Sequence, residues 1–253
     1  LSILIFIFIN IFFYRIQEHG TDRSAQILIL ILFLQTLLFL NLKKNIKSNI
    51  NHILVILGLI ISLKAFYVLY LIFLFPILWI LYKNKKLIIV GNIFNNWLFY
   101  SFLLILVLII IVNFFNTGCL MYPASVTCFE NFDWSLGKTE AIRMNDHYQL
   151  WSKGGHNPNF KVDDPSFYLQ DFNWVDRWFK NYFLNKVSDL ILGLIFVILF
   201  LTLTFYNKNY QRINFNKNNF LIFSFTFLLF FEWFYFHPAL RYGGYCLIAL
   251  IIF

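Results

Sequence analysis

Long apolar runs without charges are the feature that most constrains what this chain can fold into. Ile27–Leu42 and Leu98–Phe115 contain no charged residue, and Val187–Tyr206 contains only Asp189. Each run approaches or exceeds the roughly 17–20 residues with which a helix crosses the hydrocarbon core of a bilayer. The whole chain is 60% hydrophobic and 13% charged, whereas soluble domains are about 45–50% apolar. We therefore predict an all-α integral membrane protein, folded as a polytopic helical bundle.

Basic residues gather in three short polar loops that contain no acidic residue. The loops are "KKNIKSN" (43–49), "KNKK" (83–86) and "NKNYQRINFNKNN" (207–219). Short loops rich in Lys and Arg stay on the cytoplasmic side of a membrane. The three loops hold nine of the 20 basic residues, and the remaining 11 face 12 acidic ones. The net charge of +8 is thus explained by membrane topology, and we expect no nucleic-acid partner.

The placement of these loops predicts about seven or eight membrane segments. The segments lie at 1–14, 26–42, 51–82 (a hairpin of two), 87–115, 187–206, 220–236 and 245–253. The connections are external at 15–25 and 237–244, cytoplasmic at 43–50 and 83–86, and turn at a hairpin tip near residue 64. The first hairpin arm is short, and a re-entrant segment is the alternative interpretation. The chain starts at Leu1 and stops inside an apolar run, so we expect a fragment truncated at both ends.

Three regions follow from this topology. Residues 1–115 and 187–253 are predicted to be transmembrane, and 116–186 to form an extracytoplasmic, α-rich loop region with near-neutral charge. Within that loop region, "TEAIRMNDHYQLW" predicts a helix over Thr139–Trp151 that Thr139 caps. "DFNWVDRWFKNYF" predicts an amphipathic helix over Asp171–Phe183 that lies at the membrane interface. Its apolar face is expected to consist of Phe172, Val175, Trp178, Phe179 and Tyr182.

Cysteine placement predicts a disulfide at the start of the loop region. Cys119 and Cys128 both fall on the external side, nine positions apart across the Tyr122-Pro123 bend. An oxidising compartment permits a bond there, and two free thiols are the alternative. Cys246 is expected in the core of the last apolar segment. No His or Cys stands at metal-ligand spacing from His147 or His156, so no metal centre is predicted from the histidines.

The segment "EHGTDRSAQ" (18–26) supplies the candidate catalytic carboxylates. Glu18 and Asp22 could take a proton from an acceptor hydroxyl or hold a divalent cation, and Arg23 is a candidate for contact with an anionic substrate. The alternative is structural: Thr21 or Asp22 caps the helix that begins near Arg23.

The segment "FEWFYFHPALRYGG" (231–244) supplies the candidate phosphate site. His237-Pro238 ends a helix, Arg241 and Tyr242 follow, and a glycine pair permits a close backbone approach. An arginine fork can hold a phosphate with two charge-assisted hydrogen bonds. The alternatives for Arg241 are an ion pair with Glu232 or snorkelling to the membrane interface.

Lys64, in "ISLKAFY", interrupts an apolar stretch. Charge within a membrane segment is a functional hypothesis by default, so Lys64 is a further candidate for substrate binding. The alternative is that it lies at the aqueous hairpin tip.

Four segments together resemble a family of poorly characterised bacterial polytopic membrane proteins related to the GT-C glycosyltransferases. They are "YRIQEHGTDRSAQIL", "SLKAFYVLYL", "GCLMYPASVTCFENFDW" followed by "LWSKGG", and "HPALRYGGY". The superfamily includes protein mannosyltransferases and aminoarabinose transferases. The resemblance implies a multi-helix membrane enzyme that takes a sugar from a polyprenyl-phosphate carrier. It also implies an acidic residue in the first external loop as base or metal ligand, and an arginine near an outer helix end that faces the lipid phosphate.

The leading hypothesis is therefore a glycosyltransferase of cell-envelope glycan assembly in the bacterial inner membrane. Its partners would be the lipid bilayer, a polyprenyl-phosphate sugar donor and a glycan or lipid acceptor, with the active face extracytoplasmic. Asp22, or a carboxylate upstream of Leu1, would activate the acceptor, while Arg241 and Lys64 neutralise the leaving phosphate. An O-antigen polymerase or ligase is the closest alternative, and a transporter or flippase without chemistry is the third.

Overall fold

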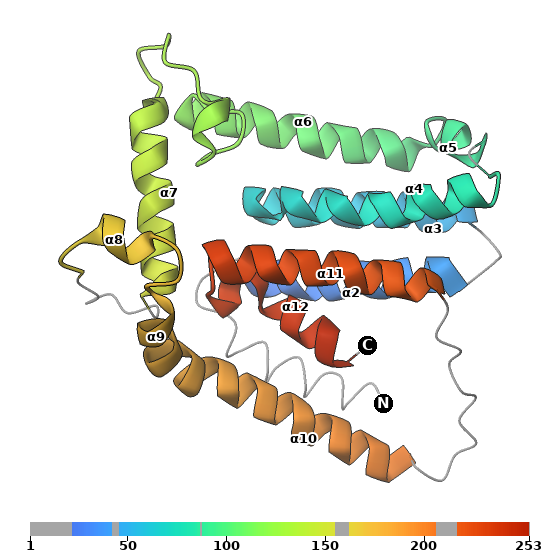
Figure 1. Ribbon diagram of the computed structural model, residues 1–253. Helices are drawn as coiled ribbons and strands as arrows, with labels where there is room; N and C mark the ends of the chain where they lie inside the picture. Colours follow the sequence, from blue (N-terminus) through green and yellow to red (C-terminus); the bar gives the residue numbers. More distant parts are fainter. Residues whose placement is uncertain (1–21, 42–45, 87, 155–161, 206–216, 253) are drawn as a thin grey trace. The chain divides into compact units, whose positions relative to one another are not determined.

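The computed structural model describes residues 22–41, 46–86, 88–154, 162–205 and 217–252. Within these ranges the chain is helical, with one isolated β-bridge between Cys119 and Cys128 and no extended strand (Figure 1). The predicted all-α class is thus confirmed. The predicted segment at 1–14 and Glu18 lie outside the described residues.

The helices follow one another along the chain as labelled in Figure 1. They are α2 (Asp22–Asn41), α3 (Ile46–Leu63), η1 (Ala65–Phe73), α4 (Leu74–Lys83), α5 (Ile88–Ile93), α6 (Trp97–Thr117), η2 (Ser125–Thr127), α7 (Gly137–Lys153), α8 (Pro165–Leu169), α9 (Val175–Trp178), η3 (Phe179–Val187), α10 (Ser188–Phe205), α11 (Lys217–Phe236) and α12 (Leu240–Ile252).

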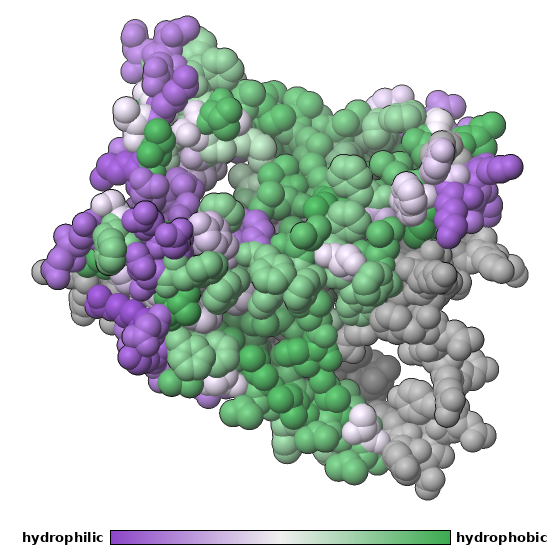
Figure 2. Space-filling model, in the orientation of Figure 1, coloured by the Kyte–Doolittle hydropathy of each residue, from purple (hydrophilic) through white to green (hydrophobic). Residues whose placement is uncertain are grey.

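Three helical stretches of the described chain are long and apolar enough to cross a membrane. They are Ala65–Lys83, Trp97–Thr117 and Val175–Thr204, with 19, 21 and 30 residues. Shorter apolar helices cover Ser24–Phe39, Ile50–Leu63 and Phe220–Phe236. Figure 2 shows hydrophobic residues over the visible faces of α6 and α10, and hydrophilic ones over α7. Within α6, Phe102 alone is buried, so most of this helix presents apolar side chains outward, as a lipid-facing helix does.

The chain forms two compact units, and α2, α7 and α11 each contribute to both. Unit 2 comprises Ser24–His147 and Lys217–Phe225. In it, α3 packs chiefly against α6 and also against η1 and α5. A Cβ built on Gly58 of α3 would lie 3.0 Å from the Phe102 ring of α6, so the glycine lets the two helices approach closely. Between α3 and η1 the backbone is extended at Lys64 (φ −154°, ψ 122°), at the position predicted for the hairpin turn.

Unit 1 comprises Leu1–Arg23, Tyr148–Asn216 and Thr226–Phe253. It contains the last turn of α7, the helical stretch from α9 through α10, the second half of α11, and α12. Trp174, Trp178 and Tyr182 recur every four residues, and all three are buried. Residues spaced in this way lie on one face of a helix. The Phe234 ring of α11 packs against this face, with its centroid 5.3 Å from Trp174 and 5.5 Å from Trp178.

Several predicted boundaries were wrong, each for a local reason. The interfacial helix predicted at Asp171–Phe183 does not stand alone: it begins at Val175 and continues into α10. Its buried face includes Trp174, whereas the side chains of Phe172 and Phe179 are 59% and 43% exposed. The segment predicted at 87–115 is interrupted before Trp97, because the side chain of Asn96 accepts a hydrogen bond from the Leu98 amide and starts a new helix there.

The predicted external loop at 237–244 is shorter than expected. Only His237–Ala239 separates α11 from α12. Arg241 and Tyr242 lie in the first turn of α12, and its backbone departs from helical geometry at Gly243 (φ −154°, ψ 15°). The helix at 139–151 is longer at both ends, since α7 spans Gly137–Lys153.

Candidate functional site

The turn between α11 and α12 is held in place by three aromatic side chains of unit 1. The indole Nε1 of Trp178 donates a hydrogen bond to the carbonyl of Pro238 (2.8 Å), and that of Trp233 donates to the carbonyl of Ala239 (2.7 Å). The hydroxyl of Tyr182 accepts from the Leu240 amide (2.8 Å). All three hydrogen bonds are buried. Leaving a buried donor or acceptor without a partner costs more free energy than a hydrogen bond contributes on balance. They fix the start of α12, and with it the residue that follows, Arg241.

Gly243 brings α12 against α11. A Cβ at Gly243 would overlap Cγ and Cδ1 of the Trp233 ring. The close backbone approach predicted for the glycine pair is thus present at Gly243, and its contact is an indole of the preceding helix.

Arg241 forms a buried ion pair with Asp22. Its Nη2 lies 3.0 Å from Oδ2 of Asp22, and the two side chains are 14% and 1% exposed. The guanidinium also lies over two rings, with its Cζ 5.4 Å from the centroids of both Trp151 and Tyr242. Asp22 is in the first turn of α2, where the helix dipole favours a carboxylate. Of the alternatives considered for Arg241, the pairing with a carboxylate is present, but the partner is Asp22 and not Glu232.

Lys153 supplies a second buried cation. It is the last residue of α7, and only 2% of its surface is exposed. Its Nζ lies 5.3 Å from the centroid of the Trp174 ring and 5.2 Å from that of Tyr235. The Tyr168 hydroxyl donates to the Lys153 carbonyl (3.1 Å), which fixes the end of the helix. Burial lowers the pKa of the Lys153 ammonium from 10.5 to about 8, so the side chain is still mostly charged at neutral pH.

His237 interacts with the surroundings of both cations. Its ring centroid is 5.3 Å from that of Tyr242. Burial, and then the charge of Lys153, lower the pKa of His237 to about 4. The imidazole is therefore neutral at pH 7. One of its ring nitrogens can donate a hydrogen bond and the other can accept one, and the ring adds no charge to the site.

The site thus combines one carboxylate, two cations and four aromatic rings in a largely buried setting. Such a setting suits an anionic ligand, because buried cations bind oxyanions more strongly than exposed ones do. It does not suit a divalent cation, since the guanidinium of Arg241 already faces the Asp22 carboxylate. No group of three His, Cys, Asp or Glu side chains comes together within the described ranges.

Of the predicted site residues, the structure brings Asp22, His237, Arg241 and Tyr242 into unit 1. Lys64 belongs to unit 2. Glu18 and the side chain of Arg23 lie outside the described part of the chain. Sequence reasoning missed Lys153 and the rings around it, which are Trp151, Trp174 and Tyr235. A signal existed for Lys153, because it is the only charged residue of "LWSKGG" (150–155), a segment that contributes to the family resemblance.

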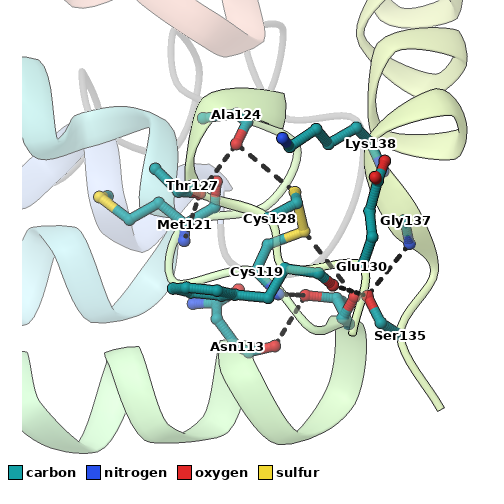
Figure 3. Close-up of a disulfide and its surroundings, with 12 residues drawn as sticks. Asn113, Cys119, Met121, Ala124, Thr127, Cys128, Glu130, Ser135, Gly137 and Lys138 are labelled. Carbon is teal, nitrogen blue, oxygen red and sulfur yellow. Dashed lines mark hydrogen bonds between the residues drawn. A yellow bond between two sulfur atoms is a disulfide. The ribbon is translucent and has the colours of Figure 1, made fainter. Parts of the chain in front are cut away.

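A separate, disulfide-bonded segment follows α6 in unit 2. Cys119 and Cys128 form the predicted disulfide (Figure 3). Hydrogen bonds flank it, from the Leu120 amide to the Thr127 carbonyl (3.1 Å) and from the Phe129 amide to the Gly118 carbonyl (2.9 Å). Both cysteines pack with Ala141 of α7 in a small buried cluster. The segment therefore ties the end of α6 to α7 and acts as a brace between them.

Gly118 makes the exit from α6 possible. It caps the helix in the left-handed conformation (φ 76°), which glycine adopts without strain. A Cβ at Gly118 would overlap the Ser135 side chain, and that hydroxyl donates to the Phe129 carbonyl and accepts from the Gly137 amide (Figure 3). The brace thus depends on a small residue at this position.

Comparison with known families finds a match over residues 1–248 to a family model described as "Domain of unknown function (DUF8201)". No curated protein and no solved structure matches the chain.

Proposed function

We propose that this chain, which belongs to the family described as Domain of unknown function (DUF8201), is a multi-pass membrane glycosyltransferase. It would take a sugar from a polyprenyl-phosphate carrier and pass it to a glycan or lipid acceptor of the cell envelope. The observation that carries the proposal is the buried pair of Asp22 and Arg241, at 3.0 Å. It places a candidate base beside a candidate phosphate-binding group in one compact unit.

In the proposed transfer each residue of the pair has a role. The guanidinium of Arg241, held over Trp151 and Tyr242, binds the phosphate of the donor. The acceptor hydroxyl attacks the anomeric carbon, the bond from that carbon to the phosphate oxygen breaks, and the phosphate leaves with the bonding electrons. Asp22 accepts the proton of the hydroxyl. Arg241 stabilises the negative charge that develops on the leaving phosphate.

The membrane setting completes the proposal. The apolar helices and the three basic loops support about seven or eight membrane segments in the bacterial inner membrane, with the site on the extracytoplasmic side. A reporter fused within 207–219 is expected to score as cytoplasmic, and one fused at Lys153 as external. The reverse result would remove the site from the side where polyprenyl-linked sugars are used.

The enzymatic test compares variants of the purified full chain in vesicles with a labelled polyprenyl-phosphate sugar. We expect Asp22→Asn and Arg241→Lys to lose most transfer, because the first removes the base and the second the planar fork. Arg143→Ala is the matched control, since Arg143 is 73% exposed and pairs with Glu140 on the same helix. Full transfer in both site variants would reject these roles.

The lipid that accumulates in cells distinguishes the alternatives. A glycosyltransferase defect leaves the polyprenyl-phosphate sugar unused. A polymerase or ligase defect leaves a polyprenyl-diphosphate oligosaccharide, and a flippase defect leaves the lipid-linked sugar in the cytoplasmic leaflet. Accumulation of either of the last two species would replace the proposed reaction.

A further inference from the structure

Lys153 is a buried cation whose described surroundings contain no counter-charge. Its ammonium faces the rings of Trp174 and Tyr235. No acidic side chain pairs with it within the part of the chain that the structure describes. The charge of Lys153 acts on the titratable side chain of His237, whose imidazole is neutral at pH 7 and supplies no counter-charge. Exposed lysines such as Lys180, by contrast, have a carboxylate at 2.8 Å.

Burial of a charge without an opposite charge is costly, so buried charges in proteins are paired or bind a ligand. Two features reduce the cost for Lys153. Aromatic faces attract a cation, and the C-terminal end of α7 carries a partial negative charge. Neither the rings nor the helix end balances a full positive charge, whereas an anionic ligand would.

The segments that hold Lys153 are the same ones that hold Arg241. Trp151, which lies under the Arg241 guanidinium, and Lys153 are on the last turn of α7. Tyr235, which borders Lys153, precedes His237, Arg241 and Tyr242 in the sequence. His237 connects the two cations, because the charge of Lys153 acts on its imidazole and its ring lies 5.3 Å from Tyr242, the ring that Arg241 also contacts. Trp174 is fully buried and Tyr235 is 37% exposed. Of the two rings beside Lys153, Tyr235 is therefore the one that lies at the surface.

We propose that Lys153 is a second anion-binding residue of the site, whose ammonium takes a phosphate oxygen of the ligand between the rings of Trp174 and Tyr235. The ligand class is a phosphate ester, either free or on a lipid. This inference rests on the proposed function, because it names a further group that binds the phosphate of the donor. The charge of Arg241 is partly balanced by the Asp22 carboxylate, whereas the full charge of Lys153 is available to the ligand.

The test is protection of Lys153 from acylation in the purified full chain. A short pulse of an amine acylating reagent at pH 8 is followed by mass spectrometry of the Lys153 and Lys180 peptides. The probes are inorganic phosphate, a prenyl phosphate, the matching prenol without phosphate, and vesicles of phosphatidylglycerol. We expect the prenyl phosphate to suppress labelling of Lys153 and not of Lys180, and the prenol to have no effect. Protection by inorganic phosphate or by phosphatidylglycerol would support the same residue and identify the source of the phosphate.

A binding measurement with Lys153→Met gives a second, independent readout. Methionine has an unbranched side chain one atom shorter than lysine, its thioether also packs favourably against aromatic rings, and it carries no charge. We expect affinity for the prenyl phosphate to fall by about tenfold or more, as for loss of one hydrogen bond to a charged group, with thermal stability at neutral pH raised. Lys180→Met is the control and should bind as the native chain does.

The outcomes separate this inference from the proposed function. Equal labelling of Lys153 with and without every phosphate probe, together with native affinity in Lys153→Met, would overturn the inference. A Lys153→Met chain that binds and transfers normally rejects the lysine site and leaves the enzyme in place. Phosphate-dependent protection in a chain that transfers no sugar rejects the enzyme and leaves the lysine site in place.

Discussion

Asp22 and Arg241 lie at opposite ends of the chain and form an ion pair at 3.0 Å, with the carboxylate 1% and the guanidinium 14% exposed. Asp22 is in the first turn of α2, and Arg241 is in the first turn of α12. The N-terminus of α2, with its positive partial charge, and the guanidinium of Arg241 thus both stabilise the Asp22 carboxylate. The pair serves the fold of unit 1 as well as the chemistry proposed for it.

Removal of Arg241 should therefore destabilise the protein strongly. We expect Arg241→Ala to lower the free energy of unfolding by about 3–5 kcal/mol, because it removes the positive charge that is paired with the buried Asp22 carboxylate. The double variant with Asp22→Ala should lose less than the two single variants together. Denaturant unfolding in detergent measures this cycle. Arg143→Ala, which breaks the exposed pair with Glu140, should change the free energy of unfolding little, and equal losses in the two arginine variants would contradict the prediction.

The pH dependence of stability should report Lys153. Its pKa is about 8 in the folded chain and 10.5 as the ordinary value, so between these values the unfolded chain binds more protons than the folded one. Stability should then rise as pH increases from about 8 to about 10.5. Below pH 8 both states are protonated, and the cost of the buried charge is fully present.

Lys153→Met removes this contribution. Melting temperatures of the native chain and the variant, taken between pH 7 and 10, should differ most at pH 7 and converge as pH rises. Lys180→Met, at an exposed lysine, should follow the native curve. A native curve that stays parallel to that of Lys153→Met would show that Lys153 is not the group that titrates.

The glycine of α12 permits a comparison between two glycine positions. Gly243→Ala should destabilise the protein by about 1–3 kcal/mol, because the added methyl would overlap the Trp233 ring. Gly91→Ala in α5 is the matched control. Nothing lies within 4 Å of a Cβ at Gly91, so alanine should be neutral or stabilising there through its higher helix propensity. Thermal unfolding of the two variants decides the matter, and similar losses would argue against a specific contact at Gly243.

How far the sequence alone predicts this structure depends on the range of the interaction. Apolar runs and turn residues act locally, so the all-α class, the break at Lys64 and the disulfide could be predicted. The length of the loop after α11 could not, because α12 begins at Leu240 owing to hydrogen bonds from Trp178 and to Tyr182. Those residues are far away in the sequence, and no local pattern contains them.

The candidate site divides in the same way. Asp22 and Arg241 could be identified because each is a charge at the edge of an apolar run. Their mutual contact could not be predicted, since nothing in either segment indicates the other. Lys153 was missed because it belongs to a polar helix, where a lysine is usually solvated. Its burial comes from Trp174 and Tyr235, two rings contributed by separate helices.

The disulfide should stabilise the segment between α6 and α7. Replacing both Cys119 and Cys128 by Ser is expected to lower the free energy of unfolding by about 2–4 kcal/mol, as for a short closed loop. Alkylation of the native chain before and after reduction, read by mass spectrometry, should add two labels on reduction, in the peptides that contain these residues. Cys246, which is buried and outside the disulfide, is the internal reference. Labels on Cys119 and Cys128 in the unreduced protein would contradict the bond.

The hydrogen bond from Trp178 to the Pro238 carbonyl should fix the turn that positions Arg241, although Trp178 itself is not expected to contact a ligand. Trp178→Phe keeps an aromatic ring beside Phe234 and removes the indole donor, which leaves a buried carbonyl unsatisfied. We expect a loss of about 1–3 kcal/mol in the free energy of unfolding.

The same variant should also weaken binding of a prenyl phosphate, because the turn that presents Arg241 is then less well fixed. Trp97→Phe is a suitable control, since Trp97 is 74% exposed at the start of α6 and should alter neither property. Phosphate affinity and unfolding measured on the same two preparations give the answer. A Trp178→Phe chain that is less stable but binds normally would mean that the turn is a scaffold of unit 1 alone, and that Arg241 is positioned by Asp22 and the ring of Trp151.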